Sequence, residues 1–325
     1  MTSSTIHLIR FRWHDIDGIK NMYDDFPWHK KQWQQLWQRH QTKRLPHALL
    51  LVGADGLGKK QFALRFAHAL LCANPNHDGK ACQQCHNCHL FQAQSHPDFM
   101  LVTPELEAKQ IKINQVRDVV QFVNQSALQG GYRIIIIDPA ASMNNNAANA
   151  LLKSLEEPTE KTLFILINNQ QLRLPVTIIS RCQKIIFQTP LTADALTWLQ
   201  KKNLSCASPE LLLKLAEGAP LKALDLLAQD IFTLRENLYQ GLYNLSRGIA
   251  DPLQLAIEFQ EKDLILVFHL LLSLLKELLL YSKTQLLDYI DYVQGAYANV
   301  LSSLNLNRQL LLEDLFIKWT QYVSC

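Results

Sequence analysis

The chain has 325 residues and a mass of 37.3 kDa, which at about 150 residues per domain predicts two or three domains. Hydrophobic residues make up 48% of the chain and charged residues 19%, which excludes disordered, collagen-like and low-complexity proteins. The formal net charge is +3, too small by itself to indicate a nucleic-acid-binding protein. The first thirty residues contain no continuous apolar run that would direct secretion, which predicts a cytoplasmic location.

The N-terminal 21 residues show no clear hydrophobic period, and Met22 is followed by a segment that itself reads like the start of a protein. We therefore expect residues 1–21 to be a dispensable extension, with an ordinary N-terminal strand or helix as the alternative. From Lys30 to Thr42 the pattern predicts a polar helix that carries Trp33 and Trp37.

A glycine-rich loop follows. The apolar run His47–Val52 has the length of a strand, and a helical pattern comes after the loop. Residues 53–60 (GADGLGKK) match the phosphate-binding pattern G-x-x-x-x-G-K, in which backbone N–H groups hold phosphates and the lysine meets the β/γ charge. Lys60 replaces the Ser or Thr that holds Mg²⁺ in such loops, so the alternative is an inherited loop that no longer uses nucleotide. The candidate nucleotide-binding residues in the loop are Gly53, Gly58 and Lys59.

A second nucleotide-binding candidate is Asp138, which closes the predicted buried strand Tyr132–Ile137 where ATPases place a Mg²⁺-coordinating acid. Pro139 follows it, in place of the Glu that many ATPases use to polarise the attacking water. Positions 60 and 139 together therefore predict a chain that does not hydrolyse ATP. Asn168 ends the neighbouring predicted strand Thr162–Ile167 and is either a polar γ-phosphate sensor or a turn-forming residue.

Two further predicted strands, Asp98–Val102 and Lys184–Phe187, alternate with helices in the same way, which predicts a parallel sheet covered on both faces. Beyond Leu191 the strand pattern gives way to short helices and then to a Leu-rich helical segment. Leu264–Leu280 carries a single polar stripe and is therefore expected to be a buried bundle helix, not a membrane span. The predicted domains are residues 22–188, 189–232 and 233–325.

Four cysteines are clustered with the spacing C-x9-C-x2-C-x2-C, which suits a closed tetrahedral Zn²⁺ site. Such a site has no open position for chemistry, so we expect a structural metal. The alternatives are that a nearby histidine replaces one ligand or that the thiols bind no metal. The candidate ligands are Cys72, Cys82, Cys85 and Cys88, and the nearby histidines are His77, His86 and His89. Cysteines without partners at ligand spacing are expected to be core or free thiols; they are Cys182, Cys206 and Cys325.

Ser180-Arg181-Cys182 follows the apolar stretch Val176–Ile179, just before the last predicted strand. An arginine here could protrude at an edge of the sheet, and an ordinary surface or ion-paired arginine is the alternative. Residues 155–158 (LEEP) end a predicted helix, and their simplest interpretation is two solvated carboxylates before a helix-stopping proline.

Taken together, these motifs resemble the delta-prime family of bacterial DNA polymerase III clamp-loader subunits, in the AAA+ class. The resemblance covers residues 22–230. It rests on PHALL (46–50), the glycine-rich loop (53–60), the four-cysteine insertion, SHPD (95–98), IIIIDPA (134–140) with Met143-Asn144, AANALLKSLEEP (147–158) and SRC (180–182). It implies an α/β plus all-α fold: a P-loop parallel-sheet domain with a zinc module at about residues 72–88, a small helical lid, and a C-terminal helical collar.

The resemblance also implies partners. Family members join gamma/tau and delta subunits in a hetero-pentamer, part of the DNA-directed DNA polymerase holoenzyme, which opens the sliding clamp and places it on primed DNA. They generally do not hydrolyse ATP but act as stators, and their Ser-Arg-Cys arginine, which is Arg181 here, reaches the ATP site of the adjacent subunit. Leu221 stands where active relatives place a nucleotide-sensing arginine, with Lys222 one residue on. By this resemblance Zn²⁺ is the expected structural cofactor, and binding of ATP or ADP is doubtful.

Two other functions remain open at this point. An ATP-hydrolysing gamma/tau-type subunit also carries a zinc module, but it is expected to have Ser or Thr at position 60 and Glu at position 139. A zinc-bearing DNA-binding module would bind DNA in a salt-sensitive way, and the weak net charge counts against it.

Overall fold

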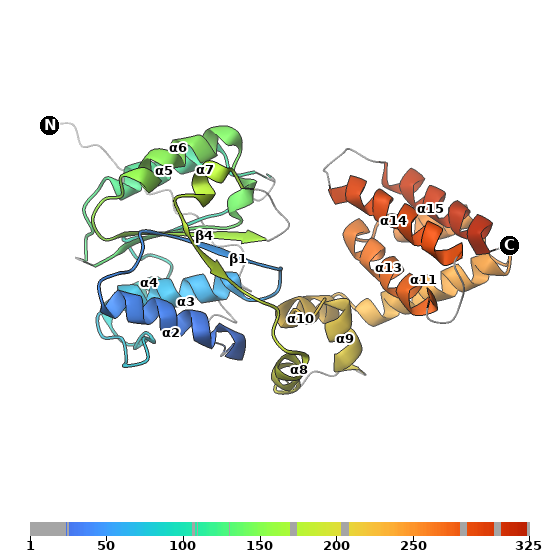
Figure 1. Cartoon of the computed structure of the whole chain (residues 1–325), viewed down its shortest axis with the longest axis horizontal. Coiled ribbons are helices and arrows are strands. Elements are labelled where there is room, and N and C mark those ends of the chain that lie inside the picture. The colour runs from blue at the N-terminus through green and yellow to red at the C-terminus, as the bar shows by residue number, and fades with distance from the viewer. Residues whose placement is uncertain are drawn as a thin grey trace. The chain divides into compact units, whose positions relative to one another are not determined.

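The computed structural model describes residues 24, 26–105, 108, 110–129, 131–169, 174–202, 208–279, 285–301 and 307–323 (Figure 1). The predicted extension at residues 1–21 lies outside these residues, as do Cys206 and Cys325. Two compact units make up the chain, residues 1–203 with 219–222 and residues 204–218 with 223–325. The division into three domains stays a prediction.

The first unit is built on a five-stranded sheet in which all neighbouring strands run parallel, in the order β2-β3-β4-β1-β5. The five predicted strands are confirmed, with β4 extending two residues further than expected. The strands are β1 (Ala48–Gly53), β2 (Phe99–Val102), β3 (Arg133–Ile137), β4 (Thr162–Asn169) and β5 (Gln183–Ile186).

Both faces of this sheet are covered. Successive side chains of a strand point to opposite faces, so Leu49 and Leu51 of β1 join one hydrophobic cluster and Leu50 joins the other. Helices lie on both faces (Figure 1). On the first face these are α2 (Lys30–Gln41), α3 (Lys59–Leu71) and α4 (His86–Gln92), and on the second α5 (Ile113–Val123), α6 (Asn145–Glu156) and α7 (Val176–Ile179).

Local sequence explains where the helices begin and end. The side chain of Asn144 caps α6 by accepting a 2.8 Å hydrogen bond from the backbone N–H of Ala147, and the helix ends before Pro158. Helix α4, in the cysteine-rich segment, has only seven residues, too few to show a helical period in the sequence. Short 3₁₀ helices, η1 (Pro27–His29) and η2 (Ala140–Ser142), precede α2 and α6.

Past the sheet every described element is a helix, which confirms the predicted α/β plus all-α fold class. Helix α8 (Thr192–Gln200) belongs to the first unit, and α9 (Pro209–Leu215) to the second. Helix α10 (Pro220–Ala228) begins in the first unit and continues in the second. The remaining helices are α11 (Ile231–Ser246), α12 (Pro252–Phe259), α13 (Leu264–Leu279), α14 (Gln285–Leu301) and α15 (Arg308–Val323).

Within the second unit α15 contacts α11, α12 and α14. The indole N–H of Trp319 on α15 donates a 2.9 Å hydrogen bond to the carbonyl oxygen of Leu242 on α11. In the polar stripe of α13, the Glu277 carboxylate binds Lys214 at 3.2 Å and Arg235 at 2.6 Å. Most apolar side chains of α13 are buried, and the helix contacts α9, α11 and α14. The prediction of a buried bundle helix is therefore confirmed.

Among the described helices, none combines the length and the apolar character that crossing a membrane requires.

Candidate functional site

The glycine-rich loop joins β1 to α3, as predicted, and its lysine turns back onto the loop. Gly56 and Gly58 have φ angles of +73° and +84°, which glycine adopts without strain. The Lys59 ammonium donates hydrogen bonds of 2.9 Å and 2.6 Å to the carbonyl oxygens of Gly53 and Ala54. Lys59 is buried, and this burial lowers its pKa below the usual range. The group that would meet a phosphate is thus already bound within the loop.

Two aromatic residues from η1 bind the outer part of the same loop. The carbonyl oxygen of Leu57 accepts hydrogen bonds from the Trp28 indole N–H at 2.9 Å and from Nε2 of His29 at 2.7 Å. Burial lowers the pKa of His29 from 6.5 to about 3, so the ring is neutral and its Nε2 carries the donated hydrogen. Neither residue was expected to contact the loop, and the sequence holds no periodic signal that would indicate it.

The first residues of α10 close the loop from another side. The backbone N–H of Leu221 donates a 3.0 Å hydrogen bond to the carbonyl oxygen of Gly56. A Cβ atom on Gly56 would lie only 2.4 Å from the backbone nitrogen of Lys222. Leu221 stands where a sensing arginine is expected in active relatives of the family. It is buried and packs at the loop.

Asp138 follows β3 directly and faces a cation of the chain itself. Nζ of Lys60 lies 3.8 Å from a carboxylate oxygen of Asp138, and the two side chains are 22% and 18% exposed. In a working site this acid and a hydroxyl at position 60 would hold Mg²⁺. Here the ammonium group stands beside the acid instead, and Pro139 offers no carboxylate. The structure thus brings the four predicted nucleotide-site residues to the carboxyl ends of β1 and β3.

Asn168 lies inside β4, paired with Val52 of β1, and it is buried. The turn interpretation of this residue is therefore wrong. The β-branched and apolar residues before it form a strand that extends through Asn169, two residues beyond the predicted end. Its role as a γ-phosphate sensor stays a prediction.

Arg181 lies at the other end of the sheet. It follows α7 and precedes β5, whose first residue Gln183 pairs with Leu49 near the amino end of β1. The glycine-rich loop leaves β1 at its carboxyl end, where Gly53 lies four residues beyond Leu49 in a strand that rises about 3.3 Å per residue. The guanidinium group and the loop of the same chain are thus separated by the length of the strand.

The Arg181 side chain is held by two neighbours. Its Nη1 donates a 2.7 Å hydrogen bond to the carbonyl oxygen of Thr177, and its Nη2 forms an ion pair with Glu156. The expectation that both carboxylates of LEEP are merely solvated is therefore wrong for Glu156, the last residue of α6. Glu157 is exposed. A carboxylate 25 residues away from Arg181 carries no sequence signal of this pairing.

The four clustered cysteines meet at one point, as predicted. Their Sγ atoms lie within 4.8 Å of one another. Three of the pairs are separated by 3.5 Å (Cys72 and Cys82), 3.9 Å (Cys72 and Cys85) and 3.9 Å (Cys82 and Cys88). Tetrahedral zinc with Zn–S bonds of about 2.3 Å separates its ligands by about 3.8 Å, so the cluster fits this ion. Within the described chain, no histidine joins the group.

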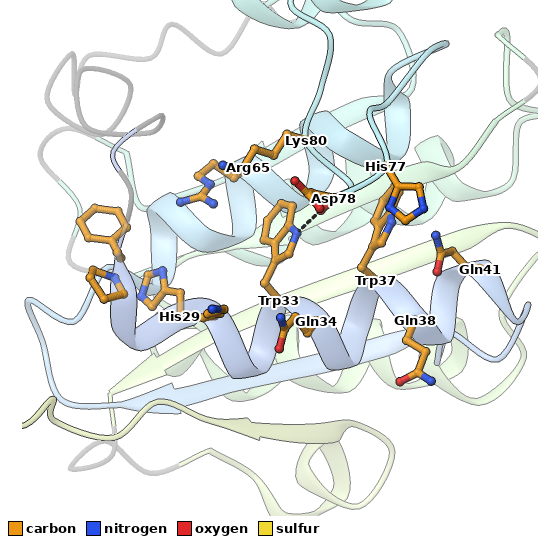
Figure 2. A pocket seen from close by; sticks show the side chains of 13 residues that line it. His29, Trp33, Gln34, Trp37, Gln38, Gln41, Arg65, His77, Asp78 and Lys80 are labelled. Carbon is orange, nitrogen blue, oxygen red and sulfur yellow. Dashed lines mark hydrogen bonds between the residues drawn. The ribbon is translucent and has the colours of Figure 1, made fainter.

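Two tryptophans of α2 bind the segment that links Cys72 to the rest of the cluster. The Trp33 indole N–H donates a 2.9 Å hydrogen bond to the carbonyl oxygen of Asp78. The side chains of Trp33 and Trp37 both border a cavity of about 590 Å³ (Figure 2). Gly79 has a φ of +78°, and a Cβ there would lie 2.2 Å from the Trp37 ring. Only glycine satisfies both conditions. Helix α2 therefore anchors the cysteine-rich module, which its polar pattern did not indicate.

The SHPD segment has a structural role in this fold. Asp98 is fully buried and accepts hydrogen bonds from the backbone N–H groups of Leu128 (2.8 Å) and Gln129 (2.9 Å). Nη2 of Arg133 lies 3.4 Å from the same carboxylate. The acid thus fixes the loop that leads into β3.

The sequence is similar to those of known proteins. Residues 28–190 match the family described as DNA polymerase III, delta subunit. A DNA polymerase III subunit delta′ of Pseudomonas aeruginosa is 36% identical, over 92% of this chain and 98% of that protein. The subunit delta′ of Escherichia coli is 30% identical, over 92% of this chain and 96% of its own length.

A solved structure supports the fold. The DNA polymerase III gamma subunit-related protein of Thermotoga maritima aligns with a TM-score of 0.50, covering 89% of this chain and 99% of its own at 17% identity. This likeness concerns the fold alone, and it agrees with the P-loop parallel sheet followed by helices. Because sequence identity extends along nearly the whole length of both delta′ relatives, the chain belongs to the DNA polymerase III subunit delta′ family.

Proposed function

We propose that the chain is a non-hydrolysing subunit of the DNA polymerase III clamp loader and supplies Arg181 in trans to the ATP site of a neighbouring subunit. Membership of the delta′ family supports the loader role. The proposed partners are gamma/tau and delta subunits in a hetero-pentamer, which meets the sliding clamp and primed DNA in the cytoplasm. The proposed domains are an AAA+ domain (22–188), a lid (189–232) and a collar (233–325).

The observation that carries the proposal is the position of Arg181. It stands before the amino end of β5, whereas the glycine-rich loop stands at the carboxyl end of β1. A guanidinium so placed is remote from phosphates held by its own loop. It is one-third exposed, so another subunit can reach it. An arginine supplied in trans neutralises charge that develops on the transferring γ-phosphoryl group.

The chain's own loop offers little to a nucleotide. Bound phosphates need the Lys59 ammonium, which instead binds the carbonyl oxygens of Gly53 and Ala54. Mg²⁺ needs Asp138, which has the Lys60 ammonium 3.8 Å away. Both cations would have to leave these partners before a magnesium nucleotide could enter. We therefore propose that this loop does not turn over ATP.

We propose that the cysteine cluster holds one structural zinc ion. Four thiolates complete a tetrahedral shell and leave no position for a water or substrate. The ligands come from the end of α3, the following segment and α4: Cys72, Cys82, Cys85 and Cys88. A cross-link of this kind compensates for the small core that so short a module can bury.

The experiment that tests the function is ATP turnover by the loader reconstituted with Arg181→Ala, stimulated by clamp and primed DNA. We expect turnover to fall by about a hundredfold or more while the complex still assembles. The matched control is Arg117→Ala, an exposed arginine on α5 whose described contact is a 3.4 Å hydrogen bond to Asn114. Unchanged turnover with Arg181→Ala would refute the role in trans, and ATP hydrolysis by the isolated chain would favour a gamma/tau-type subunit.

A further inference from the structure

The Arg181 guanidinium is ordered by its own chain before it meets any partner. Nη1 donates to the carbonyl oxygen of Thr177 at 2.7 Å and, at 3.5 Å, to the Ser180 hydroxyl. Nη2 donates one N–H to the Glu156 carboxylate. Of the three guanidinium nitrogens, Nη1 and Nη2 therefore donate to the chain itself, and Nε does not.

Nε of Arg181 makes no hydrogen bond to the described part of the chain, whereas Nη2 makes one, to Glu156. An Nε–H is one of the charged donors with which arginine binds phosphate oxygens. The contacts to Thr177 and Glu156 therefore leave the Nε–H available for a phosphate while they hold the guanidinium group in place.

The helix that carries Glu156 is well packed. Glu156 ends α6, and the preceding Leu155 is buried in the cluster that also buries Ile178 of α7. The two helices contact each other. A side chain at the end of a packed helix thus reaches the residue that follows the neighbouring helix, so the ion pair links two elements with fixed relative positions.

We propose that Glu156 is a positioning residue that holds Arg181 so that its Nε–H faces a phosphate of the neighbouring subunit's nucleotide. The inference rests on the proposed function of Arg181. An arginine held in one rotamer loses less conformational freedom when it engages its target. The carboxylate is 47% exposed, so solvent screens much of its charge and reduces its competition with the phosphate for the guanidinium group.

The test is steady-state ATP turnover by the loader reconstituted with Glu156→Gln, measured as kcat and KM separately. We expect kcat to fall about fivefold with KM for ATP within about twofold of wild type, because the ordering matters when charge develops on the transferred group. Glu156→Asp, which keeps the charge, should recover part of the loss. The matched control is Glu157→Gln, the same change at an exposed carboxylate that does not contact Arg181, and it should behave as wild type.

A double variant separates the two proposals. If Glu156 acts through Arg181, then Glu156→Gln combined with Arg181→Ala should be no slower than Arg181→Ala alone. A loss with Arg181→Ala but wild-type turnover with Glu156→Gln would overturn the positioning role and leave the proposed function standing. Faster turnover with Glu156→Gln would also overturn it, because the carboxylate would then restrain the arginine. Unchanged turnover with Arg181→Ala would refute the proposed function itself.

Discussion

The indole N–H of Trp33 donates a 2.9 Å hydrogen bond to the carbonyl oxygen of Asp78, which ties α2 to the cysteine-rich module. The Trp37 ring packs against Gly79 in the same segment, and both tryptophans are 8% exposed. This segment leads from Cys72 to the remaining cysteines. We therefore expect loss of a metal from the cluster to change the environment of Trp33 and Trp37. Figure 2 shows both indoles extending from α2 toward the segment that carries His77 and Asp78.

Protein prepared without added metal should contain one zinc ion per chain by elemental analysis. Removing the metal with a chelator should shift tryptophan emission to longer wavelength, because segment 77–80 loses its anchor and water reaches Trp33 and Trp37. Cys85→Ser should show the shifted emission without a chelator. Cys182→Ser, at a partly buried cysteine outside the cluster, should keep both zinc and emission. Absence of zinc, or emission indifferent to the chelator, would contradict the structural metal site.

The buried Asp98 should matter far more for stability than an exposed acid. Asp98→Asn leaves Arg133 without a counter-charge inside the fold and weakens two backbone hydrogen bonds, so we expect a loss on the order of 3 kcal/mol in the free energy of unfolding. Glu105→Gln breaks an exposed pair with Lys112 and should cost less than about 1 kcal/mol. Urea denaturation of both variants measures the difference. Equal losses would show that the Asp98 network does not stabilise the fold.

His29 should make stability depend on pH. Its folded-state pKa is lowered to about 3, so as pH falls through 6.5 the unfolded chain takes up a proton that the folded chain does not. Stability is therefore lost as pH falls from 6.5 toward 3, by up to about 1.4 kcal/mol per pH unit for one proton. His29→Gln keeps an N–H donor for the Leu57 carbonyl oxygen but cannot titrate. Urea denaturation between pH 7 and pH 4 should give a shallower pH dependence for the variant, whereas parallel curves would contradict the buried neutral histidine.

Much of the fold could be predicted because its strands are short apolar runs separated by glycines, prolines and helical periods. The four isoleucines of β3 and the run Leu49–Leu51 of β1 are continuously apolar, which is typical of strands in a sheet covered on both faces, and all of them are buried. The cysteine cluster was equally clear, since two C-x2-C spacings bring thiols together through local geometry alone.

The parts that could not be predicted depend on contacts between residues far apart in the chain. The Arg181–Glu156 pair spans 25 residues, and the Trp33–Asp78 hydrogen bond spans 45. In both pairs, no sequence motif contains the two residues together. They meet only because the elements that carry them pack against each other. At Asn168 a local sequence signal was misleading. Two consecutive asparagines, Asn168 and Asn169, are typical of a turn, but pairing with β1 keeps the backbone extended there.

The most direct test compares ATP turnover of the loader reconstituted with Lys59→Met and with Arg181→Ala. The comparison distinguishes a contribution to a neighbouring subunit's ATP site from catalysis by the chain's own loop. Lys59→Met removes the loop's ammonium while keeping its bulk, and melting temperature and assembly confirm that each variant folds and joins the complex. We predict turnover within about twofold of wild type for Lys59→Met and a fall of about a hundredfold or more for Arg181→Ala. The reverse pattern, with Lys59→Met inactive and Arg181→Ala unimpaired, would contradict the proposed role.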